Sequence, residues 1–169
     1  MKRIMAATVI TAAAAATLAG CSVSTATPLV LNADSCSKLE SSLGKSIDGF
    51  ALQSDSKLGD KGGKCTWTHP KTGAAIFLNV ENDSKSGVEV NVEEPRDKIA
   101  KDKSLTVIEN DSVKNFDDSV LYTTKGTEKS TSRTFTAEDG ADTKVTLITA
   151  EVAMTNAQAS DVFTNLFKG

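Results

Sequence analysis

The stretch Gly63-Lys64-Cys65-Thr66-Trp67-Thr68-His69 ties the predicted fold together. It holds the only tryptophan and the only histidine of the chain, and Cys65 lies two residues before Trp67. In a strand, side chains two residues apart leave the backbone on the same face, so both would point into one core. Cys36 lies upstream in a predicted short helix. A Cys36–Cys65 disulfide would pin that helix to the strand, with Trp67 as the largest apolar side chain beside it.

The first twenty residues have the pattern of an export signal. Met1-Lys2-Arg3 is positively charged, and an apolar, alanine-rich run follows over residues 4–17. Leu18-Ala19-Gly20-Cys21 then resembles a bacterial lipobox, which is cleaved before a cysteine that has received a diacylglycerol. The alternatives are an ordinary secretory signal with an incidental cysteine, or a transmembrane anchor. The apolar run is shorter than the roughly 20 residues that span a bilayer, so we predict lipidation at Cys21.

Cleavage would divide the chain into three parts. We predict a lipoprotein signal peptide over residues 1–20, a lipidated tether over 21–33 and a single globular domain over 34–169. The tether is rich in Ser, Thr and Ala, which suits a segment that holds the domain away from the bilayer. The expected location is the outer face of the cell membrane, in a bacterial cell envelope.

The charge of the chain bears on its partners. Its formal net charge is −3, and removal of Lys2 and Arg3 with the signal would make it more negative. Nucleic acid is therefore not an expected partner, because phosphate binding needs clustered Lys and Arg. Nor is there a polybasic segment for anionic lipid headgroups. Attachment to the membrane would depend on the acyl chains of Cys21.

With Cys21 acylated, Cys36 and Cys65 are the two cysteines that remain. Disulfides persist in exported proteins, and a single pairing exists. Closing a loop of this length would stabilise the fold by roughly 3.5 kcal/mol in the chain-entropy estimate. The alternative is a metal site that uses both thiols. It lacks further ligands, with His69 the sole imidazole, whereas structural zinc takes four. We predict a disulfide, no metal and no cofactor.

Hydrophobic periodicity and turn residues predict the order of elements. Asp34 and Ser35 favour the start of a helix that ends before Gly44. The apolar residues near Val145 do not alternate cleanly, which indicates a strand covered on both faces. The first expected elements are a helix over 35–43, a strand over 47–52, a mobile loop over 54–63, and a hairpin of strands 65–69 and 74–80 around a turn at 70–73. Next we expect a strand over 88–92, or else a loop that leads into a short helix over 95–103. Four further strands are expected over 105–108, 119–124, 131–137 and 144–152.

A second helix is predicted at the end of the chain. Thr155 and Gln158 form a capping box, with the threonine at the N-cap. An apolar stripe at helical spacing follows and suits burial against a sheet better than a membrane surface, because no basic face accompanies it. The fold class is therefore α+β: an antiparallel β-sheet of about five to seven strands, with a short N-terminal helix and a C-terminal helix packed on it.

Catalytic motifs are not found. His69 lacks an accompanying nucleophile motif and is interpreted as a partly exposed residue at a strand end. The pairs Glu93-Glu94 and Asp117-Asp118 are adjacent residues, which point to opposite faces of a strand. Asp139 and Asp142 flank a turn glycine and fit turn chemistry better than a calcium loop. We predict that the protein is not an enzyme.

The spacing of these residues resembles a known family. A lipobox, a short linker, Asp34-Ser35-Cys36-Ser37-Lys38-Leu39 and then Cys65-Thr66-Trp67 resemble the actinobacterial cell-envelope lipoproteins catalogued as domain of unknown function 3558. The resemblance covers most of the mature chain and brings no catalytic residue with it. The order of elements also resembles the PsbP-like sandwich of some mycobacterial lipoproteins, in which helices flank an antiparallel sheet.

Two classes of function remain. The first is a lipid-anchored, extracytoplasmic lipoprotein that is a non-enzymatic binding or accessory module and recognises an envelope protein. The alternative is a carrier or receptor for a small molecule or envelope lipid. An apolar cavity between sheet and C-terminal helix would favour the carrier, and a filled core with an exposed apolar patch would favour the binding module.

Overall fold

A computed structural model describes Leu31 and residues 35–59, 62–82, 95–116, 119–127, 129–139 and 143–167. Several predictions lie outside these residues. They are the signal peptide, lipidation at Cys21, most of the tether, the strand over 88–92, the pairs Glu93-Glu94 and Asp117-Asp118, and Asp142.

The described chain contains eight strands and several short helices around one longer C-terminal helix. The helical elements are η1 (Cys36–Leu39), α1 (Glu40–Leu43), η2 (Gly44–Ile47), α2 (Pro95–Lys101), α3 (Asp111–Lys114) and α4 (Asn156–Phe167), where η marks a 3₁₀ helix. The strands are β1 (Ala51–Leu52), β2 (Lys57–Gly59), β3 (Gly62–Thr68), β4 (Ala75–Asn82), β5 (Leu105–Ile108), β6 (Val120–Thr124), β7 (Arg133–Glu138) and β8 (Thr143–Ala150). The predicted α+β class is confirmed, with one strand more than the upper expectation.

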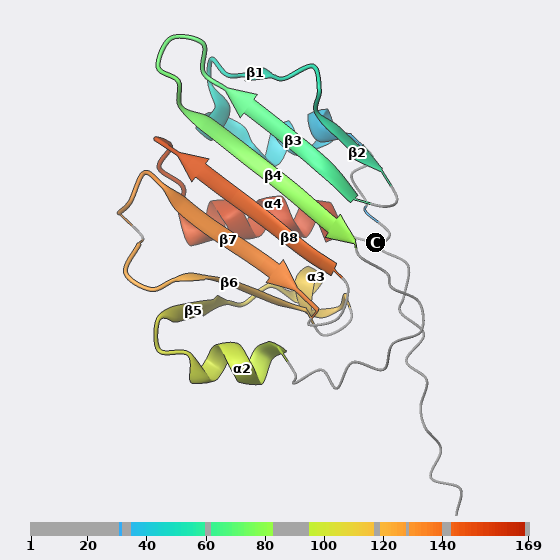
Figure 1. Cartoon of the computed structure of the whole chain (residues 1–169), viewed down its shortest axis with the longest axis vertical. Coiled ribbons are helices and arrows are strands. Elements are labelled where there is room, and N and C mark those ends of the chain that lie inside the picture. The colour runs from blue at the N-terminus through green and yellow to red at the C-terminus, as the bar shows by residue number, and fades with distance from the viewer. Residues whose placement is uncertain are drawn as a thin grey trace, which may run out of the picture.

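All eight strands belong to one antiparallel sheet, in the order β1-β3-β4-β8-β7-β6-β5, with β2 also paired to β3. The sheet has two halves, β1–β4 and β5–β8, whose last strands pair with each other at the centre (Figure 1). We call both halves meanders, although in the first half β1 and β2 both pair with β3 and not with each other. This central pairing runs from Ala75↔Ala150 to Asn82↔Thr143. The connection between the meanders contains α2, which contacts β5 and β6 at one end of the sheet.

The core lies between one face of this sheet and a layer of helices. In Figure 1, α4 lies behind β4 and β8, and the N-terminal helices lie behind β3 and β4. We call the face that meets these helices the inner face and the other the outer face. The main core joins Trp67, Phe135 and Leu147 of the strands to Leu39 and Phe163 of the helices, and each of these side chains is at most 1% exposed.

The C-terminal helix has the predicted cap and the predicted buried stripe. Gln158 N donates to Thr155 Oγ1 at 3.2 Å, and Thr155 N donates to Gln158 Oε1 at 2.8 Å, which is the reciprocal pattern of a capping box. The stripe is buried against the inner face. Its members are Ala159, Val162, Phe163, Leu166 and Phe167.

The predicted N-terminal helix lies in the expected place but has a different form. It runs from Cys36 to Ile47 as a 3₁₀ turn, one turn of α-helix and another 3₁₀ turn. The Ser35 side chain makes no capping bond, whereas Gly44 has the positive φ (49°) expected after a helix. Because Ile47 belongs to the last of these turns, the first strand is shorter than predicted and contains only Ala51 and Leu52.

The prediction of a mobile loop over 54–63 is wrong. This segment contains β2 and the start of β3, which pair through Leu58↔Gly63 and its neighbours. Gly62 and Gly63 both have positive φ, and a Cβ at either would lie about 2 Å from a backbone oxygen, of Val80 or of Lys57. The glycines are therefore required by close approach of strands, and their composition had indicated flexibility instead.

The prediction that the strand near Val145 is covered on both faces is also wrong. Its burial alternates: Thr143, Val145, Leu147 and Thr149 are buried, while Lys144 and Ile148 are exposed. The alternation is hidden in the sequence because two of the inward positions hold threonine. The Thr149 hydroxyl accepts from Arg133 N at 3.0 Å, which satisfies it inside the core.

Two polar side chains that the sequence analysis missed position the helices. Asn110 begins α3 by accepting from Val113 N at 2.9 Å, and its amide donates to Ser160 Oγ of α4 at 2.8 Å. Arg133 is 3% exposed. Its guanidinium donates to Met154 O and to Asn156 Oδ1, both at 2.6 Å, and lies 4.5 Å from the centre of the Phe135 ring. It thereby fixes the start of α4.

We expect Phe163→Ala to lower the free energy of unfolding by about 3–5 kcal/mol, because the ring is fully buried between α4 and the sheet. Chemical denaturation of the two proteins measures the difference. Asp161→Ala, at an exposed position of the same helix, is the matched control and should change stability by no more than about 0.5 kcal/mol. Equal stability of Phe163→Ala and wild type would contradict the packing of α4 described above.

Candidate functional site

The predicted disulfide is present. Cys36 of η1 and Cys65 of β3 are bonded, with their Cα atoms 5.5 Å apart. Cys65 and Trp67 are both buried on the inner face of β3, as their spacing predicted. A hydrogen bond joins the next helical turn to the same strand, since Trp67 Nε1 donates to Glu40 Oε1 of α1 at 3.2 Å. Helix and strand are therefore held together by a covalent and a polar contact.

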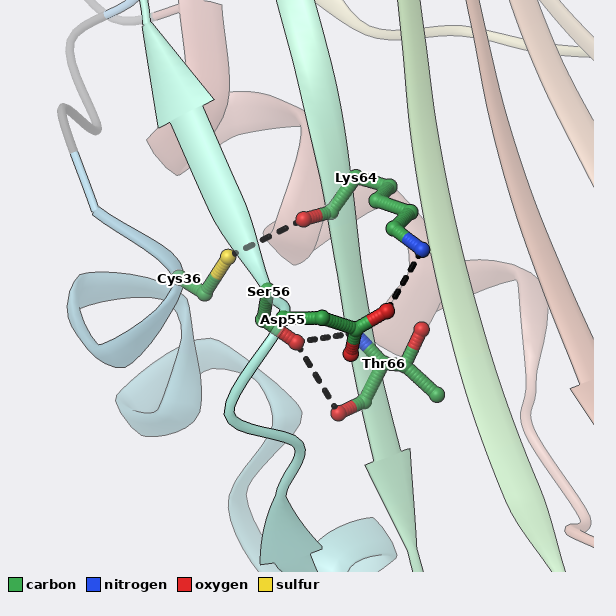
Figure 2. A network of polar contacts seen from close by, with 5 residues as sticks. All are labelled: Cys36, Asp55, Ser56, Lys64 and Thr66. Carbon is green, nitrogen blue, oxygen red and sulfur yellow. Dashed lines mark hydrogen bonds and ion pairs between the residues drawn. The ribbon is translucent and has the colours of Figure 1, made fainter.

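The segment before β2 is fastened to β3 beside this disulfide (Figure 2). Ser56 Oγ accepts from Thr66 N at 3.0 Å, and Lys64 Nζ lies 2.6 Å from Asp55 Oδ2. The hydrogen bond and positive charge of Lys64 hold the pKa of Asp55 below its usual value. The Cys36 sulfur lies 3.5 Å from Lys64 O, and because an oxidised cysteine has no thiol proton, this is a packing contact. These contacts are structural in character.

The geometry gives His69 a turn-capping role. Its Nδ1 accepts from Lys71 N and Thr72 N, both at 3.3 Å. Its ring meets Phe50 edge-on, with centroids 5.4 Å apart. The residue is half-buried at the end of β3, which confirms the predicted position. These contacts place the imidazole in the hairpin turn.

Turn chemistry also accounts for Asp139, whose Oδ1 accepts from Thr143 N at 3.0 Å. Within the described ranges, no group of three or more His, Cys, Asp or Glu side chains could hold a metal ion. None of the helices in that part of the chain is long and apolar enough to cross a membrane.

The space between sheet and C-terminal helix, where the carrier alternative needs a cavity, is occupied by aromatic side chains. The Phe163 and Phe167 rings are stacked with centroids 6.4 Å apart, and the Phe116 ring lies 5.1 Å from that of Phe167. Trp67 and Phe135 are buried in the same core. This arrangement matches the filled core that favours a binding module.

The outer face of the sheet holds the exposed apolar side chains. In the described part of the chain, the large hydrophobic residues that are exposed are Phe77 of β4 and Ile148 of β8, each 39% accessible. They are direct cross-strand partners, so they form one continuous apolar surface at the centre of the sheet. In Figure 1 no labelled helix lies in front of β3, β4, β8 and β7.

Mostly uncharged side chains surround this pair, and alternation along each strand places them on the outer face. Ala75 and Thr136 are themselves buried, and the exposed Lys64, opposite Asn79 in the register, adds a charge on the β3 side. We call the uncharged set the outer patch: Thr66, Thr68, Ala75, Phe77, Asn79, Thr134, Thr136, Thr146, Ile148 and Ala150. A row of charged residues crosses one end of it, because Glu81 pairs with Lys144 and Lys144 with Glu138. An apolar centre, a polar surround and charge at the margin are typical of protein-binding surfaces.

Tyr122 lies beside the outer patch, opposite Thr136 in the register. Burial, together with the negative charge of Glu138, raises the pKa of Tyr122 to about 12. The hydroxyl therefore stays protonated far above neutral pH and can donate a hydrogen bond at this margin.

No family model, curated protein or solved structure matches this chain. The resemblance to actinobacterial lipoproteins stays a prediction. Cys36 and Cys65, which were predicted to pair because they are the two cysteines left once Cys21 is acylated, are bonded in the structure. The outer patch was missed, since it forms only when β4 pairs with a strand about seventy residues away.

We expect reduction of the Cys36–Cys65 bond to change three properties together. Titratable thiols of the denatured protein should rise by two. The free energy of unfolding should fall by about 2–5 kcal/mol. Fluorescence of Trp67, the only tryptophan, should change because disulfides quench nearby indoles. The double variant with Cys36→Ser and Cys65→Ser should reproduce the loss of stability, and two free thiols in protein purified without reductant would disprove the bond.

The raised pKa of Tyr122 predicts that the protein loses stability at alkaline pH. Its folded-state pKa of about 12 exceeds the value of about 10 expected in the unfolded chain. The stabilisation it provides is therefore complete below pH about 10 and is lost as the pH rises towards about 12. Compared with Tyr122→Phe, the wild type should lose stability more steeply across this range. Tyr122 is the only tyrosine, so tyrosinate absorbance reports its titration, and a midpoint near 10 in the folded protein would contradict the shift.

Proposed function

We propose that this protein is a lipid-anchored, extracytoplasmic lipoprotein of the bacterial cell envelope, and that it is a non-enzymatic binding module that recognises a protein through the outer patch. The observation that carries the binding role is the outer patch itself, in which Phe77 and Ile148 are exposed side by side on central strands. Exposed apolar side chains that are contiguous and rimmed by polar residues are a feature of protein-binding sites.

Two features support the location. The amino-terminal sequence has the charge, apolar run and cysteine of a lipoprotein signal ending at Cys21. The Cys36–Cys65 disulfide belongs to the core, and such bonds persist in oxidising, extracytoplasmic compartments. Relation to the actinobacterial family of unknown function 3558 is part of the same proposal.

The alternative is a carrier or receptor for a small molecule or envelope lipid. The stacked aromatic side chains between α4 and the sheet favour the binding module over this alternative. An enzymatic role has no support in the contacts of His69, which are made with its own turn.

The anchor is tested by Cys21→Ser, with Ser24→Ala as a control near the same cleavage site. We expect the wild type and Ser24→Ala to remain with the membrane fraction and to incorporate labelled fatty acid. Cys21→Ser should appear in the soluble fraction or as uncleaved precursor, because the acyl chains are the strong membrane attachment. Equal incorporation of fatty acid by wild type and Cys21→Ser would overturn the anchoring.

The binding role is tested by photo-crosslinking in cells that export the lipid-anchored protein. A photo-crosslinking residue is placed at Thr146, within the outer patch, or at Asp161, an exposed position of α4. We expect discrete protein adducts from position 146, their loss when Ile148→Lys is added, and no comparable adducts from position 161. Lipid or small-molecule adducts without protein would favour the carrier, and the absence of adducts at position 146 would overturn binding through the outer patch.

A further inference from the structure

The rows of side chains across the outer patch are self-complementary. Register pairs Phe77 with Ile148, Asn79 with Thr146 and Glu81 with Lys144, each time one residue on β4 and one on β8. A two-fold axis that runs parallel to the strands, midway between β4 and β8, exchanges the positions of the two members of every pair. In two copies related by this axis, Phe77 faces Ile148, and Glu81 faces Lys144.

We propose that the outer patch binds a second copy of this chain across that axis. The inference rests on the proposed function, because it names the partner of the same surface. Each copy would supply one strand face, so the interface would be a sheet packed on a sheet with the strands of the two copies aligned. The contact is isologous and closes after two copies.

Charge distinguishes this axis from the other one that would bring two outer patches together. An axis across the strands would lay the charged row over the opposite end of the patch, where Ala75 pairs with Ala150. Lys144 and Glu81 would then lose water without gaining a partner, which is unfavourable. On the axis between β4 and β8, each Lys144 amine meets a carboxylate. Within the described residues this amine makes no hydrogen bond or ion pair of its own.

The area of the outer patch limits the expected affinity of the dimer. Four strands about 4.8 Å apart and four rows about 6.8 Å apart cover roughly 500 Å², below the usual area of about 800 Å² per partner. Apolar contact between Phe77 and Ile148 supplies most of the attraction, while the charged pairs fix the register. The dimer should therefore be reversible, with a dissociation constant on the order of 10 μM.

The test uses the exported chain with Cys21→Ser, which is free of lipid and of a third thiol and is separated from any precursor that retains the apolar run of residues 4–17. Sedimentation equilibrium should show a monomer–dimer equilibrium. Ile148→Lys or Phe77→Lys should weaken it at least about tenfold. Thr124→Lys, an exposed change on β6 beyond the outer patch, should leave it unchanged. Melting temperatures are recorded for every variant, so that loss of folding is recognised.

A charge exchange tests the axis. Glu81→Lys and Lys144→Glu should each weaken the dimer, and their combination should restore it. Glu138→Lys is the matched control, since Glu138 also flanks Lys144 within the sheet but does not face it across the axis. An effect that acted only within one chain would make Glu138→Lys as damaging as Glu81→Lys.

Disulfide trapping tests directly whether β4 of one copy faces β8 of the other. Mixing a chain that carries Asn79→Cys with one that carries Thr146→Cys should give a mixed disulfide faster than either variant alone. A wild type that stays monomeric at concentrations well above the expected dissociation constant would overturn self-association. In that case, adducts between position 146 and a different envelope protein would still support the proposed function. A dimer that persists in Ile148→Lys and in the charge variants would place the interface elsewhere and would also overturn the inference.

Discussion

The pairing of β4 with β8 is the constraint on which the rest of the structure depends. It joins the last strand of each meander over their full lengths. It also places α4, which follows β8, across the centre of the inner face (Figure 1). Contacts between segments so far apart in the chain are slow to form, because the entropy of closing a long loop opposes them. We therefore expect the central pairing to form after the local pairings within each meander.

The disulfide acts on the first meander alone. Helical turns as short as η1, α1 and η2 have little stability in isolation, so they need contacts with β3 to persist. The Cys36–Cys65 bond and the Trp67–Glu40 hydrogen bond supply these contacts. The second meander has no disulfide. Polar side chains fasten it to α4 instead: Arg133 bonds to the start of the helix and Asn110 to its side.

Features that depend on neighbouring residues could be predicted from sequence. The shared face of Cys65 and Trp67 follows from strand geometry, and the capping box of α4 follows from residues three apart. Features that depend on distant partners could not. Gly62 and Gly63 are conformational requirements of strands that approach closely, yet their composition is that of a loop.

The same limit applies to the outer patch. Phe77 and Ile148 become neighbours only through the register of β4 with β8, which no local pattern specifies. The alternation of β8 was also concealed, because Thr143 and Thr149 fill inward positions that usually hold apolar residues. Without that alternation, Ile148 could not be assigned to the outer face.

The helices of the main core leave Phe77 and Ile148 exposed on the outer face, although Val120, Ala75 and Thr136 on that face are buried. The helices at the start of the chain, between β5 and β6, and after β8 all contribute to the main core on the inner face. The outer face of the sheet holds many threonines, because threonine favours strands and presents a polar hydroxyl to water. The ends of the sheet are short strands, β1 with two residues and β5 with four, which is how proteins discourage pairing through edges. Phe77 and Ile148 depart from this pattern of protection, so the exposed large apolar side chains of the described residues lie on the face of the sheet and not at its edges.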